Sequence, residues 1–62
     1  MAWDEHVLRL PDGQEIRIAV DEDKAVRWAD HWELMYAAYK AGLVRAEVGP
    51  PSTYNHISYY LL

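Results

Sequence analysis

The stretch HVLRLPDGQEIRIAV, residues 6–20, constrains the fold more than any other part of the sequence. Apolar and polar side chains alternate on both sides of PDGQ, in which proline presets one backbone angle and glycine accepts a positive φ. This pattern predicts a β-hairpin. The side chains expected on its buried face are Leu8, Leu10, Ile16, Ile18 and Val20.

The chain has 62 residues and no cysteine. This length predicts one domain, residues 1–62, with one hydrophobic core. Disulfides cannot stabilise it, and an oxidising compartment is not implied. A chain this short therefore needs a dense core or self-association. Because it contains three Trp and five Tyr, we expect a core rich in these aromatic side chains.

Residues 21–43 are predicted to form one helix that covers the sheet. Asp21 is the expected N-cap, and Gly42 is the expected left-handed residue after the C-terminus. A step of about 100° per residue places one apolar stripe along this helix. Its members are Ala25, Trp28, Ala29, Trp32, Met35, Tyr36, Tyr39 and Leu43.

Residues 44–62 are predicted to form a second hairpin. GPPST, residues 49–53, interrupts the strand pattern because adjacent prolines cannot donate to a ladder. In the last strand, from about Tyr54 to the end of the chain, Ile57, Tyr59 and Leu61 point one way. The side chains that point the other way are Tyr54, His56, Ser58, Tyr60 and Leu62.

The expected fold is therefore an α+β domain with the element order ββαββ. It consists of a four-stranded, mainly antiparallel sheet with one helix packed on one face. The strand order is left open by the sequence. One face of such a sheet has no cover, which raises the question of what it contacts.

The net charge of −4 argues against nonspecific binding to nucleic acid or to anionic membranes. No apolar run approaches the roughly 20 residues that span a bilayer. The N-terminal residues lack a basic start followed by an apolar stretch, so no signal peptide is expected. These features favour a cytoplasmic protein.

Catalysis and metal binding are not expected. His56 and Ser58 lie on one face of the last strand, but no nucleophile elbow or orienting acid accompanies them. The other histidines, His6 and His31, are too far apart in sequence for a familiar ligand spacing. The chain is predicted to be no enzyme, with no cofactor, metal or small-molecule ligand.

The segment AGLVRAEVGPPSTYNHISYYLL, residues 41–62, resembles the end of a winged-helix DNA-binding domain. In that family a recognition helix is followed by a wing strand, a Pro/Gly-rich tip and a returning strand with Tyr and Leu. The resemblance covers about the last third of the chain. A winged helix needs a three-helix core, whereas here a hairpin precedes a single helix without a basic cluster. A small nucleic-acid-binding domain is thus an alternative function, with no DNA-contacting residue assigned.

The function that we expect is a non-catalytic protein-binding module or small inhibitor that acts through the open sheet face. Tyr and Arg are enriched at interface hot spots. The partner is another protein or a second copy of the chain, as a homodimer. A phage-type, anti-CRISPR-like inhibitor of a host defence or nucleic-acid enzyme is an alternative. The expected partner-binding residues are Arg9, Arg17, Arg45, Tyr54, His56, Tyr60 and Leu62.

Two further surfaces are possible contacts. One is the acidic start of the predicted helix, at residues 21–23. The other is a patch of small and apolar residues on the far side of that helix, where a partner could approach closely. This patch consists of Leu34, Ala37, Ala38 and Ala41.

Overall fold

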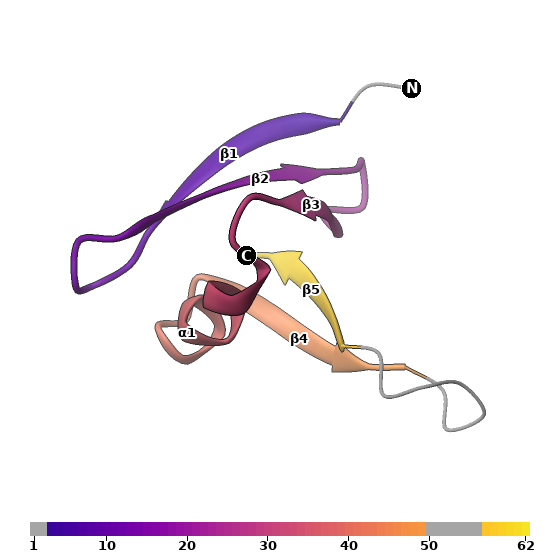
Figure 1. The fold of residues 1–62 in the computed structure, drawn as a ribbon. Coiled ribbons are helices and arrows are strands. Elements are labelled where there is room, and N and C mark those ends of the chain that lie inside the picture. The colour runs from indigo at the N-terminus through magenta and orange to yellow at the C-terminus, as the bar shows by residue number, and fades with distance from the viewer. Residues whose placement is uncertain (1–2, 50–56) are drawn as a thin grey trace.

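The computed structural model describes residues 3–49 and 57–62. The order of elements is β1 (Asp4–Arg9), β2 (Glu15–Val20), β3 (Val26–Ala29), the 3₁₀ helix η1 (Trp32–Leu34), α1 (Met35–Lys40), β4 (Val44–Val48) and β5 (Ile57–Leu61). The strands form two antiparallel sheets, with the orders β1-β2-β3 and β4-β5. Figure 1 shows α1 and the β4–β5 hairpin on the same side of the three-stranded sheet.

The α+β class and the antiparallel pairing are confirmed. The prediction of one four-stranded sheet with the order ββαββ was wrong, because a fifth strand, β3, occupies part of the segment expected to be helical. The three-helix core of a winged helix does not occur in the described residues, which hold one α-helix of six residues.

The β1–β2 hairpin forms as the sequence predicts, in uninterrupted register. The N–H of Leu10 donates to the carbonyl of Gln14 at 2.8 Å, and the N–H of Gly13 donates to the carbonyl of Leu10 at 2.9 Å. Gly13 has a φ of 96°. This is a type I turn followed by a left-handed residue, a common three-residue hairpin loop.

The β2–β3 connection repeats that loop geometry without a glycine. The N–H of Lys24 donates to the carbonyl of Asp21 at 2.9 Å, and the N–H of Asp21 donates to the carbonyl of Ala25 at 3.1 Å. Lys24 has a φ of 68°, in the left-handed region. Asp21 is therefore no helix N-cap, and its carboxylate instead accepts hydrogen bonds from the N–H groups of Asp23 and Ala25.

The C-terminal end of the helix matches the prediction. Gly42 has a φ of 80°. Its N–H donates to the carbonyl of Tyr39 at 3.0 Å, and the N–H of Leu43 donates to the carbonyl of Ala38 at 3.0 Å. This pair of bonds is the Schellman motif, which satisfies carbonyls that the end of a helix leaves free.

The core is aliphatic, so the prediction of a Trp/Tyr-rich core was wrong. Trp28, Trp32, Tyr36 and Tyr39 are all more than two-fifths exposed. The inner faces of β1 and β2 supply most of the buried side chains, and α1 and β4 cover them. The core consists of Leu8, Leu10, Ile16, Ile18, Val20, Ala29, Met35, Ala38 and Val44.

The two sheets meet where β5 passes the start of β3. Ala25 and Tyr60 form an antiparallel bridge, and the N–H of Leu61 donates to the carbonyl of Lys24 at 2.8 Å. These contacts partly cover the β3 end of the three-stranded sheet. The opposite end of that sheet is the outer edge of β1.

Replacing Asp21 with alanine should destabilise the protein, because two backbone N–H groups of the β2–β3 loop lose their acceptor. We expect the free energy of unfolding in urea to fall by about 1–2 kcal/mol. Asp23→Ala is the matched control, since this exposed neighbour contributes only its backbone N–H to the loop. Equal losses in both variants would contradict the role of Asp21.

The pKa of Asp12 lies below its ordinary value of 3.8 because the carboxylate accepts hydrogen bonds from the backbone N–H and the side-chain amide of Gln14. A carboxyl whose pKa is depressed by folding adds stability that is fully present above the unfolded value and is lost as the pH falls through the folded value. The urea midpoint of wild type should therefore exceed that of Asp12→Asn most at about pH 5. The difference should shrink as the pH falls below 3.8. A pH-independent difference would contradict this account.

Candidate protein-interaction face

The outer face of the three-stranded sheet is the surface turned away from α1 and the β4–β5 hairpin (Figure 1). Side chains alternate between the two faces of a strand. Because Leu8, Ile16 and Ile18 fill the core, their sequence neighbours point outward. The outer face therefore carries Glu5, Val7, Arg9, Glu15, Arg17, Ala19 and Trp28.

A β-bulge in β3 places the side chain of Trp28 on this face. Val26 pairs with Val20, but Trp28 pairs with Ala19, which leaves Arg27 as an extra residue of β3. The shift places the indole of Trp28 beside Ala19, which is only 8% exposed. The bulge thus sets a large aromatic side chain on the outer face rather than in the core.

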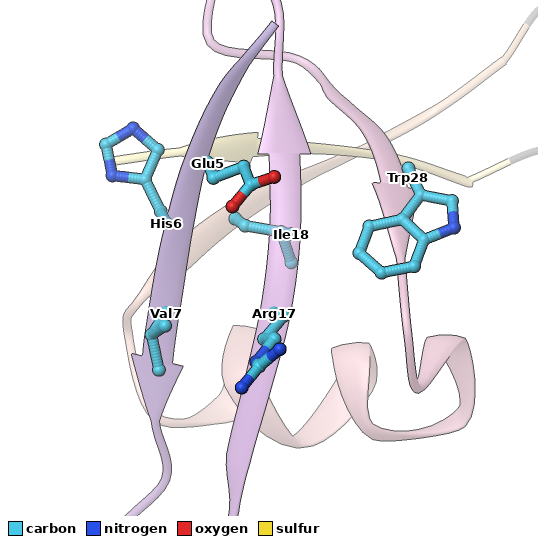
Figure 2. A pocket seen from close by; sticks show the side chains of 6 residues that line it. All are labelled: Glu5, His6, Val7, Arg17, Ile18 and Trp28. Carbon is cyan, nitrogen blue, oxygen red and sulfur yellow. The ribbon is translucent and has the colours of Figure 1, made fainter.

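The outer face contains an open hollow of about 390 Å³. Figure 2 shows its lining, with α1 behind the sheet and the indole of Trp28 at one side. Glu5 and Arg17 bring opposite charges to the hollow, and Val7 adds an apolar side chain. The complete lining is Glu5, His6, Val7, Arg17, Ile18 and Trp28, of which His6 and Ile18 have the register of the inner face.

Large apolar side chains are exposed at and beside this hollow. Val7 is 58% exposed, Trp28 47% and Trp3 49%. The guanidinium carbon of Arg27 lies 6.0 Å from the ring centroid of Trp3. Aromatic and arginine side chains without a cover are typical of interface cores. We therefore define the interaction face as Trp3, Glu5, Val7, Arg17 and Trp28.

Two of the arginines predicted at the site, Arg9 and Arg17, lie on the outer face. The Nη2 and Nε atoms of Arg9 donate to one carboxylate oxygen of Glu15 at 2.9 and 3.1 Å. Among the described residues, the guanidinium of Arg17 forms no such ion pair. Its backbone N–H donates to the carboxylate of Asp30 at 3.0 Å. Its carbonyl accepts from the N–H of Asp30 at 3.0 Å, which continues the β2–β3 pairing beyond β3.

The remaining predicted site residues do not join that face. Arg45 and Tyr60 oppose each other on the β4–β5 sheet, with the guanidinium carbon 4.5 Å from the ring centroid. Arg45 also forms an ion pair with Glu47. Leu62 is exposed just after β5. Tyr54 and His56 lie outside the described residues, so the structure gives no position for them.

The predicted site therefore divides between two sheets, because the single open sheet expected from the sequence does not form. Trp3 and Trp28 were missed as site residues. Trp28 was assigned to a helical core stripe, although the short strand sequence VRWA contains a β-branched and an aromatic residue, both of which favour strands.

A second exposed aromatic group lies on η1 and α1. It consists of Trp32, Tyr36 and Tyr39, and the last two rings have their centroids 5.9 Å apart. The ammonium of Lys40 lies 5.7 Å from the ring of Tyr36. None of these three side chains lines the hollow of the three-stranded sheet.

The small-residue patch expected on the helix does not exist as a continuous exposed surface. Ala38 is fully buried, and Leu34 is half-buried against the core. Only Ala37 and Ala41 of this group are exposed. The reason is that α1 packs against the core through Met35 and Ala38, and not through the side that carries Tyr36 and Tyr39.

Within residues 3–49 and 57–62, no three acidic or histidine side chains gather as a metal site. No buried polar or charged residue occurs there either. The helices of these described segments are all too short or too polar to cross a bilayer.

No protein-family model, curated protein or solved structure matches this chain. The interaction face is therefore interpreted from its own residues and geometry.

Two alanine substitutions compare how much a buried aliphatic side chain and an exposed aromatic side chain contribute to stability. Met35 is fully buried, and Met35→Ala should lower the free energy of unfolding by about 2–5 kcal/mol. Trp28 is half exposed, and Trp28→Ala should cost no more than about 1 kcal/mol, despite deleting the larger side chain. Urea unfolding followed by circular dichroism measures both. A larger loss of unfolding free energy for Trp28→Ala than for Met35→Ala would indicate that Trp28 belongs to the core.

Proposed function

We propose that this chain is a non-catalytic protein-binding module that engages another protein through the interaction face. The observation that carries the proposal is the placement of Trp28 and Val7 on a sheet face that no described element covers (Figure 2), with Trp3 exposed just before β1. Exposed apolar side chains rimmed by charges are typical of protein contacts. A partner would gain the burial of these side chains on binding.

The charges at the hollow suggest how a partner is oriented. Glu5 and Arg17 lie on neighbouring strands and both line the hollow. A partner with one cation and one anion at matching positions would satisfy both, and this requirement favours one orientation over the reverse. Charged groups at an interface contribute more to such specificity than to affinity.

An inhibitor function is one form of this proposal. A small domain that inserts Trp28 and Val7 into a partner's groove would block that groove for the natural ligand. The phage-type inhibitor of a host defence or nucleic-acid enzyme and a cytoplasmic location remain parts of the proposal. The exposed side chains of Trp28 and Val7 support protein binding in general.

The experiment compares two tryptophans of nearly equal exposure. Trp28 is 47% exposed on the interaction face, and Trp32 is 50% exposed on η1. Immobilised wild type, Trp28→Ala and Trp32→Ala are incubated with lysate of the native host, and the captured proteins are quantified by mass spectrometry. We expect Trp28→Ala to lose at least about tenfold in capture of the wild-type partner, which corresponds to one hot-spot side chain.

Trp32→Ala should capture the same partner as wild type. Nuclease treatment of the lysate should leave the capture unchanged, since the contact is with protein. Loss of capture in Trp32→Ala alone would place the binding surface on η1 and α1. Nuclease-sensitive capture would favour the nucleic-acid alternative.

A further inference from the structure

The outer edge of β1 is unpaired within the described residues, because β1 is the terminal strand of its sheet (Figure 1). Natural sheets protect such edges with proline, lysine, bulges or covering segments. The six residues of β1, DEHVLR, contain no proline or lysine, and their charges, at Asp4, Glu5 and Arg9, are of both signs. Their register with β2 is uninterrupted, so no bulge twists the edge away. The free edge of β1 can therefore form backbone hydrogen bonds with another strand.

The turn shows which backbone groups of β1 face this edge. Leu10 exchanges hydrogen bonds on the β2 side, with the carbonyl of Gln14 and the N–H of Gly13. The direction of the backbone groups alternates from residue to residue along an antiparallel strand. Even-numbered residues of β1 therefore bond to β2. The residues whose N–H and carbonyl groups face the free edge are Glu5, Val7 and Arg9.

We propose that a second copy of this chain pairs with β1 through that edge, antiparallel and centred on Val7. In this register Val7 opposes Val7 of the second copy, and Glu5 opposes Arg9 of the second copy. Because the two copies are related by a two-fold axis, the Glu5–Arg9 pair occurs twice. One such pair of opposite charges therefore lies on each side of the two valines. All three pairs are hydrogen-bonded pairs, because their members are the residues that direct backbone groups to the edge.

Charge selects this register over its neighbours. A shift that centres the pairing on Glu5 would place two glutamates opposite each other, and like charges directly opposed are destabilising. A shift that opposes Glu5 with Val7 leaves both charges without a counterpart. Only the Val7-centred arrangement matches Glu5 with Arg9 on both sides. It also brings Pro11 opposite Trp3, where the missing N–H of proline ends the ladder.

Arg9 can take part without giving up its contact inside the chain. Its Nε and Nη2 atoms bond to Glu15, and a guanidinium has further N–H donors. The second carboxylate would thus extend an existing ion pair. The inference does not depend on the proposed function, since it rests on the free backbone groups of β1, although the side chains of Glu5 and Val7 belong to both surfaces.

Charge reversal with complementation tests the pairing. Purified wild type, Glu5→Arg and Arg9→Glu are compared by sedimentation velocity from micromolar to several hundred micromolar. Wild type should form a dimer, and each single variant should raise the dimer dissociation constant by at least about tenfold. An equimolar mixture of the two variants should dimerise again, because each of the two flanking pairs then joins one arginine with one glutamate.

Two controls separate edge pairing from general effects. Glu22→Arg changes the net charge equally at an exposed position in the β2–β3 loop and should dimerise like wild type. Val7→Pro removes an N–H that faces the free edge but no bond to β2, so it should remain folded by circular dichroism and be monomeric. Val7→Thr keeps that N–H and should dimerise.

Several results would overturn the proposal. They are a wild-type monomer at the highest concentration, dimers in both single variants, and a mixture that stays monomeric. A wild-type dimer that persists in Val7→Pro would place the contact on another surface. Arg9 does not line the hollow, so Arg9→Glu separates the two proposals. Loss of dimerisation with normal partner capture in this variant would leave the proposed function intact, and the reverse would leave the dimer intact.

Discussion

The burial of the inner face of β2 is the interaction on which the rest of this structure depends. Ile16 and Ile18 are fully buried, and they lie on the central strand of the three-stranded sheet. Met35 from α1 and Val44 from β4 close over them. Each neighbouring element is held by this one small aliphatic cluster, since the chain has no cysteine to add a covalent link.

The buried core is aliphatic, and Tyr59 packs against it only in part. The cluster takes Leu, Ile, Val, Met and Ala, which pack densely between the sheet and a six-residue helix. Trp28, Trp32, Tyr36 and Tyr39 remain at least partly in water. This exposed aromatic surface is the feature that motivates the proposed contact with another protein.

The hairpins could be predicted because their chemistry is local. PDGQ supplies proline and a left-handed glycine, and the alternation on either side assigns the buried face of β1 and β2 correctly. The Schellman end at Gly42 was predictable for the same reason. The faces of Ile57, Tyr59 and Leu61 also follow from simple alternation, as their pairing with β4 shows.

The β2–β3 loop could not be predicted from the sequence. It adopts the geometry of the β1–β2 loop, but its left-handed position holds a residue type that is rarely found there. Lys24 occupies the left-handed position where glycine or asparagine is usual. Asp21, followed by acidic residues, is equally typical of a helix N-terminus. Contacts between residues distant in sequence determine which of the two structures, loop and strand or helix, this segment adopts. As a strand, β3 adds Ala29 to the core and gives β5 an edge to contact at Ala25.

The formation of β3 in place of a helix also changed which residues make up the candidate site. A helix over residues 21–31 would have buried Trp28 against the sheet, whereas strand β3 and its bulge place it on the outer face. Alternation alone then located Val7 and Arg17 correctly, but it could not say that Arg45 and Tyr60 belong to a different sheet. Strand order depends on contacts distant in sequence, and no local pattern encodes it.

The free edge of β1 and the interaction face are connected by geometry. In antiparallel pairing, residues directly opposite each other project to the same side of the sheet. Two chains paired about Val7 would therefore present both hollows on one side of a continuous sheet. A partner with two matching sites would bind the second hollow at a high effective concentration, which can raise avidity without any new contact. A weak face on each chain would then suffice for tight binding, and the small size of the domain would cease to limit its affinity.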